Sequence, residues 1–176
     1  HREYKNVIDS MDGIYIELSP TEENYHRINL YEVREETDEK GRVFVNLEES
    51  SKAILPFLFK IVRLLDEKEL TGQVKVALID TLKALYEKWE INSDPESLYV
   101  IKDGLKVRKA MPTLYDHYLL MKKHPDLHRV VPFFRMFTRD SGDPSKSIFD
   151  GESTFDVTEF KPICICLEGL DKEFMQ

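Results

Sequence analysis

Strand-like sequence lies near the two ends of the chain, and helix-like sequence fills the middle. Residues 14–18 alternate in the manner of a strand, and residues 162–167 form a continuous apolar run, typical of a strand covered on both faces. Between these segments, apolar residues recur at helical spacing. This order predicts a partial α/β core, too short of strands for a complete doubly wound sheet, that an all-α region interrupts.

Two helices in the middle predict a helical hairpin. Residues 53–65 are apolar almost all round, which predicts a helix buried on most sides; it is expected to be capped by Ser50 or Ser51, with Pro56 near its first turns. Thr71 and Gly72 end it. The next helix, residues 73–91, is amphipathic and is predicted to bury Val74, Leu78, Leu82, Leu85, Tyr86 and Trp89.

Shorter patterns predict the remaining elements. Helices are expected over residues 2–11, 114–123 and 127–138, and Pro132 either kinks the last of these or marks its true start. The charged stretch within 33–46 predicts a solvated loop or a hairpin tip, residues 92–110 and 139–146 predict loops, and residues 155–157 predict a short strand. The predicted division is a partial α/β core over 1–46, an all-α insertion over 47–140, and a return to the α/β core over 141–176.

Composition narrows the function classes. The chain has 176 residues and a formal net charge of -8, which argues against a stand-alone nucleic-acid binder while leaving a local DNA contact open. No run approaches the roughly 18 apolar residues of a membrane span, and no signal peptide is recognisable. Cys164 and Cys166, two apart in a predicted strand, are interpreted as buried thiols in a reducing compartment.

The motifs of common catalytic sites are missing from the sequence. It contains no GxxxxGK[ST], GxGxxG, HExxH, paired CxxC or GxSxG, and therefore no catalytic, cofactor-binding or metal-binding residue is assigned. His117, His124 and His128 are interpreted as surface or helix-end histidines, with a metal site as the less favoured alternative. Asp150, with Glu152 and Asp156, is expected to cap backbone N–H groups in a turn, with a cation site as the alternative.

Three stretches in order resemble the P-loop ATPases that power conjugation and type IV secretion. The first runs from Arg2-Glu3-Tyr4 through GIYIELS to Ile28-Asn29-Leu30, although Leu30 stands where the family often has proline. The second is Met111-Pro112-Thr113, similar to the start of a helix in the family's all-α insertion. The third is Phe149-Asp150-Gly151 followed by the strand over 162–169, similar to the segment before the Walker B strand.

The resemblance implies that this chain is an internal fragment of a hexameric RecA-like motor. It would begin after the P-loop strand and stop before Walker B, which would also account for the first residue not being methionine. ATP and Mg²⁺ would belong to the parent protein, with no cofactor in this chain. The matching residues are expected to be structural: Gly13, Asn29, Pro112, Thr113, Phe149, Asp150 and Gly151.

The resemblance also implies a location and partners. The parent would be cytoplasmic and peripheral to the inner face of the cell membrane, and its helical insertion would contact other secretion or conjugation proteins. The isolated chain would not hydrolyse ATP. Two alternatives stay open: a self-contained α-helical protein-interaction domain unrelated to ATPases, and a small metal- or nucleotide-binding enzyme around residues 117–128.

Overall fold

The structure is a computed structural model that describes residues 14–17, 27–142, 149–154 and 163–166. The helix expected over 2–11, Gly13, and the strand expected over 155–157 lie outside these residues. The helices are α2 (Leu47–Leu65), α3 (Gly72–Lys88), α4 (Leu114–Met121) and α5 (Val131–Arg135), with the short 3₁₀ helices η1 (Glu67–Glu69), η2 (Pro95–Leu98), η3 (Pro125–Leu127) and η4 (Arg139–Ser141). The strands are β1 (Ile14–Glu17), β2 (Glu35–Thr37), β3 (Val43–Val45), β4 (Tyr99–Lys102), β5 (Leu105–Arg108) and β6 (Ile163–Cys166).

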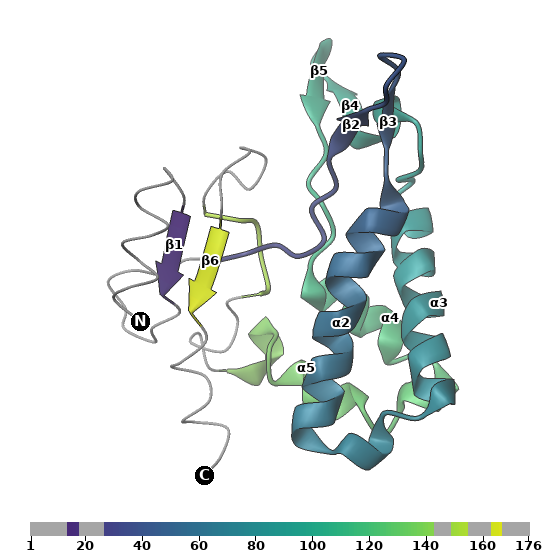
Figure 1. The fold of residues 1–176 in the computed structure, drawn as a ribbon, viewed down its shortest axis with the longest axis vertical. Helices are drawn as coiled ribbons and strands as arrows, with labels where there is room; N and C mark the ends of the chain where they lie inside the picture. Colours follow the sequence, from purple (N-terminus) through teal and green to yellow (C-terminus); the bar gives the residue numbers. More distant parts are fainter. Residues whose placement is uncertain (1–13, 18–26, 143–148, 155–162, 167–176) are drawn as a thin grey trace.

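The first and last described strands pair with each other. β1 and β6 are parallel neighbours, with Ile14 opposite Ile163 and Glu17 opposite Cys166. A parallel pair needs a long crossover between its strands. Here everything between β1 and β6 forms that crossover, and most of it is a separate helical region beside the sheet (Figure 1).

The helical region is built on an antiparallel pair, α2 and α3, against which α4 and α5 pack (Figure 1). The core of this region contains fully buried Ile54, Leu58, Leu78, Leu82, Leu85, Leu98, Leu114, Met121, Leu127 and Phe134. None of the helices among the described residues is long and apolar enough to span a bilayer.

Helix α2 differs from its prediction at its start and in its burial. Its N-cap is Asn46, whose side chain accepts a hydrogen bond from the Glu49 N–H at 3.1 Å, so Pro56 lies in the helix interior rather than in the first turns. One face of the helix is buried, whereas Pro56 and Lys60 are exposed. The expectation of burial on most sides was wrong because aromatic and aliphatic residues such as Phe57 flank the buried stripe and stay half-buried.

Helix α3 follows the predicted hairpin closely. Thr71 caps it by accepting from the Val74 N–H at 3.2 Å, and the helix ends at Lys88, three residues before the predicted end at Ile91. The predicted apolar face is buried apart from half-buried Trp89.

Two proline-containing segments shorten the last predicted helix. Residues 127–138 do not form one helix. Instead α5 covers only Val131–Arg135, and Pro132 stands at its start, which confirms one of the two predicted roles of this proline. Because Pro132 lacks the N–H that an interior helix position needs, the chain before Pro132 forms the separate turn of η3 instead.

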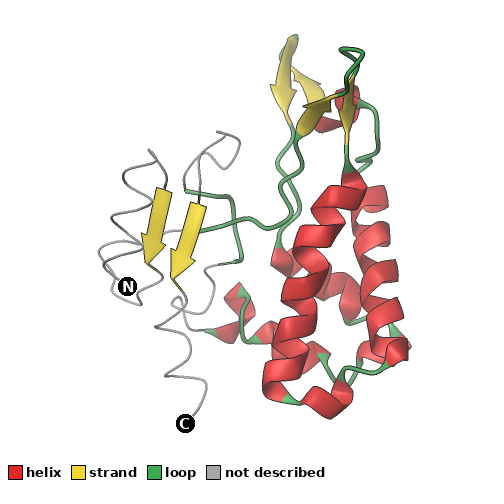
Figure 2. Ribbon diagram, viewed as in Figure 1, coloured by secondary structure: helices red, strands yellow, loops and turns green. Residues whose placement is uncertain are grey.

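The range expected to be all-α also contains a β-hairpin. β4 and β5 lie within residues 92–110, which were predicted as a loop, and that prediction was wrong for these residues. A second hairpin, β2 with β3, occupies the charged stretch where a hairpin tip was one of two options. Both hairpins stand at the same end of the helical region (Figure 2).

Candidate functional site

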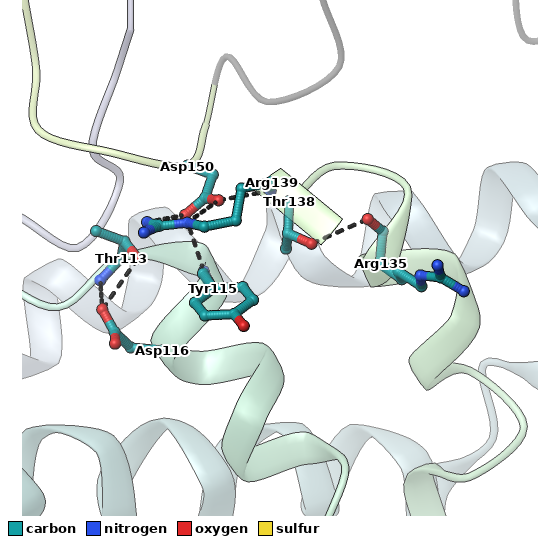
Figure 3. Close-up of polar contacts among 7 residues, drawn as sticks. All are labelled: Thr113, Tyr115, Asp116, Arg135, Thr138, Arg139 and Asp150. Carbon is teal, nitrogen blue, oxygen red and sulfur yellow. Dashed lines mark hydrogen bonds and ion pairs between the residues drawn. The ribbon is translucent and has the colours of Figure 1, made fainter. Parts of the chain in front are cut away.

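The structure describes most of the residues that carry the family resemblance. They come from separate segments and meet where the chain enters and leaves the helical region. Figure 3 shows the polar contacts around Asp150. We define the junction as Asn29, Pro112, Thr113 and Asp150 of these residues, together with their hydrogen-bond partners Arg139 and Ser153. Gly13 lies outside the described residues.

Asp150 is the acceptor at the centre of the junction. Its buried carboxylate accepts from the backbone N–H of Arg139 at 2.7 Å and from the Arg139 guanidinium at 3.0 and 3.1 Å. It also accepts from the N–H of Tyr115, in the first turn of α4, at 3.2 Å. Burial alone would raise the pKa of the Asp150 carboxyl, but the hydrogen bonds from Arg139 outweigh it and hold that pKa below its usual value.

The start of α4 is fixed from the other side. Thr113 is the N-cap, and its backbone N–H and hydroxyl both donate to the Asp116 carboxylate, at 2.8 and 3.0 Å. The Pro112 carbonyl accepts from the Asn29 side-chain amide at 3.0 Å. The segment before the helix is therefore held by the segment that enters the helical region.

Asn29 joins the incoming and outgoing chain. Its side-chain oxygen accepts from the Tyr31 N–H at 3.0 Å, and its own N–H donates to the Ser153 hydroxyl at 2.9 Å. Arg27 and Thr154 exchange two further hydrogen bonds, each at 3.1 Å. Residues 27–29 and 153–154 thus run side by side although they are far apart in sequence.

Phe149 and Gly151 pack around this crossing. The Phe149 ring is buried against Phe57 of α2, with ring centroids 4.6 Å apart. Gly151 has φ 150°, a backbone conformation that strains other residues, and a Cβ there would lie 3.1 Å from Cδ of Arg27, so it would also crowd the arginine side chain.

The junction has the hydrogen bonds of a structural clamp. Both carboxylate oxygens of Asp150 are engaged by backbone and guanidinium donors, and Asp150 thereby caps the segments that begin α4 and η4. Across residues 14–17, 27–142, 149–154 and 163–166, no group of three or more His, Cys, Asp or Glu side chains could hold a metal ion. Asp156 lies outside that part of the chain.

The three grouped histidines do not share a site. His117 is completely buried, so its interpretation as a surface or helix-end residue was wrong. His124 caps η3 by accepting from the Asp126 N–H at 3.3 Å, and His128 is exposed. His117 falls on the buried face of α4 with Leu114, Tyr118 and Met121. The sequence displays this helical spacing, which could have predicted the burial of His117.

His117 lies in a buried chain of hydrogen bonds that crosses the helical region. The Thr81 hydroxyl donates to the Ala77 carbonyl at 2.9 Å, so its oxygen accepts from Nε2–H of His117, also at 2.9 Å. Nδ1 of the neutral ring then accepts from the Tyr31 hydroxyl at 2.9 Å. Burial lowers the pKa of His117 to about 3 and raises that of Tyr31 well above its usual value, which keeps both groups uncharged.

Comparison of the fold finds a similar protein, whereas the comparisons of the sequence find none. No family model and no curated protein sequence matches the chain. Among solved structures, the chain is similar to VirB4 of Thermoanaerobacter pseudethanolicus, with a TM-score of 0.53 and 19% sequence identity over 94% of this chain. The match spans 39% of the VirB4 chain. The chain therefore has the fold of a segment of VirB4, in agreement with its sequence resemblance to the motor ATPases of type IV secretion.

Proposed function

We propose that this chain is the middle segment of a motor ATPase of a conjugation or type IV secretion apparatus. The observation that carries the proposal is the likeness of fold to VirB4 over nearly the whole chain. It is supported by the ordered sequence resemblance, which rests on the sequence alone, over residues 2–30, 111–116 and 148–170.

The topology supports a partial RecA-like core that carries a helical insertion. β1 and β6 lie side by side in parallel, as neighbouring strands of a RecA-like sheet would, and the chain segments that enter and leave the helical region lie side by side at the junction. The junction holds these two segments together, so the helical region begins and ends at one place.

The helical region serves contacts with other proteins of the apparatus, and the chain by itself does not hydrolyse ATP. The sequence has no GxxxxGK[ST] phosphate-binding loop, and we assign ATP and Mg²⁺ to the parent protein. That parent would be a hexamer in the cytoplasm at the inner face of the membrane. The net charge of -8 gives no support to DNA binding by this segment.

The reading frame around this sequence tests the proposal directly. A GxxxxGK[ST] motif should be encoded shortly upstream of His1, and an apolar strand ending in Asp-Glu should be encoded shortly downstream of Gln176. A reading frame in which both motifs are absent would contradict the proposal and would favour a self-contained helical interaction domain.

An assay on the purified chain tests its catalytic inactivity. Phosphate release from ATP with Mg²⁺ should stay at the level of a buffer control, because the sequence has no GxxxxGK[ST] motif to bind the phosphates. Turnover that depends on Mg²⁺ and grows with chain concentration would show that a catalytic site lies within these residues.

A further inference from the structure

The first turn of α4 depends on an acceptor that lies outside the helix. Thr113 and Asp116 form a capping box at the helix start, which leaves the N–H of Tyr115, between them, to find another acceptor. That N–H donates to the Asp150 carboxylate at 3.2 Å, from the segment that leaves the helical region. Because α4 has only eight residues, too few to be stable alone, we expect its first turn to need this contact.

Arg139 strengthens the hold of the leaving segment on the same turn. Its guanidinium donates to both carboxylate oxygens of Asp150 and also lies over the Tyr115 ring, 4.7 Å from the ring centroid (Figure 3). The backbone and the side chain of Tyr115 are therefore both held by this ion pair.

The entering segment holds α4 at two other points. The Asn29 side-chain amide donates to the Pro112 carbonyl at 3.0 Å, just before the helix. The Tyr31 hydroxyl donates to Nδ1 of His117 at 2.9 Å, one turn further on. The first turn thus lies between two contacts from the entering segment and carries its own contact from the leaving segment.

The two segments are joined to each other by separate contacts. The Asn29 N–H donates to the Ser153 hydroxyl at 2.9 Å, and the Arg27 N–H donates to the Thr154 hydroxyl at 3.1 Å. Within the part of the chain that the structure describes, the hydrogen bonds of Ser153 and Thr154 go to residues 27–29 and not to α4. The spacing of the two segments is therefore held by groups that do not bond to the helix.

We propose that the first turn of α4 is a latch on these two segments. It is closed while residues 27–29 and 153–154 lie together, and it opens when they separate. Asn29 and Asp150 reach α4 from different segments, so both can bond to it only at the present spacing of those segments. Buried Tyr118 and Met121 keep the second turn packed, which confines the opening to the first turn.

The latch would link the helical region to the rest of the proposed motor. Any movement that separates the entering and leaving segments would reach the buried core of the helical region through α4. This role rests on the proposed function, whereas the latch itself is a property of the chain.

Amide hydrogen exchange of the full chain, followed residue by residue by NMR, tests the latch. Ser153→Ala and Thr154→Val each remove a hydroxyl that joins the two segments. Each variant should speed the exchange of the Tyr115 and His117 amides roughly fivefold, which is the change in the open population expected when one neutral hydrogen bond is lost.

Ser97→Ala is the matched control. It removes a hydroxyl that accepts the Asn92 N–H at 3.1 Å, in the turn before β4, and so costs a similar hydrogen bond away from the two segments. The Tyr115 and His117 amides should exchange in this variant as they do in the unmodified chain.

Two results would overturn the latch. Unchanged exchange of the Tyr115 and His117 amides in Ser153→Ala and Thr154→Val would show that the first turn opens independently of the two segments. Equal acceleration in Ser97→Ala would show that these amides exchange only when the whole region unfolds. The exchange rates depend on this chain alone, whereas the proposed function depends on the motifs that flank it in its reading frame, so the two proposals fail separately.

Discussion

Acidification from pH 7 to pH 5 should destabilise the helical region through one side chain, His117. The unfolded chain takes up a proton at this position below a pKa of about 6.5, whereas burial lowers the pKa in the folded state to about 3. The unfolded state therefore binds more protons in this window. Stability is full above about pH 6.5 and falls as the pH drops toward the folded pKa.

The magnitude follows from the difference in protonation. At pH 5 the unfolded imidazole is almost fully protonated and the folded one almost fully neutral, so the loss is about 2 kcal/mol relative to neutral pH. The side chains that bond to the ring, Tyr31 and Thr81, stay uncharged throughout this range. The lowered pKa of Asp150 means that the linkage of this group appears only at more acidic pH, as that carboxylate becomes protonated.

Urea denaturation at pH 7, 6 and 5, followed by the fluorescence of Trp89, measures this loss. His117→Gln should unfold more easily at pH 7, by about 1–3 kcal/mol, because it disturbs buried hydrogen bonds. It should then lose far less stability than the unmodified chain between pH 7 and pH 5. His128→Gln replaces an exposed histidine and should keep the full pH dependence. Equal losses for the unmodified chain and His117→Gln would refute the assignment.

Further substitutions test other buried polar groups and the hairpin turn. Tyr31→Phe should lower the free energy of unfolding by about 1–3 kcal/mol in urea denaturation, since it leaves Nδ1 of His117 without its donor. Tyr86→Phe should be neutral or stabilising, since the buried Tyr86 hydroxyl has no hydrogen-bond partner in the described part of the chain. Equal losses of stability in the two variants would contradict this contrast. Asp150→Asn should cost about 1.5–3 kcal/mol by the same measurement, because it removes the charged acceptor of Arg139, and an unchanged midpoint would show that the clamp contributes little. Gly104→Ala should cost about 1 kcal/mol, from its left-handed φ of 78° alone, since nothing lies within 4 Å of the added Cβ, and a cost near zero in thermal unfolding would show that the turn is not left-handed in solution.

Helical periodicity predicted α3 because its burial is one-sided and regular, whereas α2 was predicted from a run of residues that are apolar almost all round. The α2–α3 hairpin and the start of α4 at Thr113 follow from apolar spacing and capping residues, and both are present. The β4–β5 hairpin was missed although Asp103-Gly104 is a strong turn signal. Only the second strand, Leu105 to Arg108, alternates apolar and polar residues; Tyr99-Val100-Ile101 does not, so the strand pattern was present on one side of the turn alone.

The long-range polar contacts could not be predicted from local pattern. Arg139 gives no sign in the sequence that it pairs with Asp150, and Tyr31 gives none that its hydroxyl reaches His117, 86 residues away. The resemblance marked Asn29 and Asp150 as structural residues, but which segments they hold together depends on how the helices pack. Burial of His117, by contrast, was open to prediction from its place on the apolar face of α4.

The hydrogen bonds between Arg27 and Thr154 have a consequence for the order in which the molecule folds. These residues are 127 apart in sequence, and bringing such distant points together in a flexible chain carries a large loop-closure entropy. Once the helical region has formed, it holds both points at the junction and the remaining closure between β1 and β6 is short. Folding is therefore expected to proceed from the middle of the chain outward, with the parallel strands pairing last.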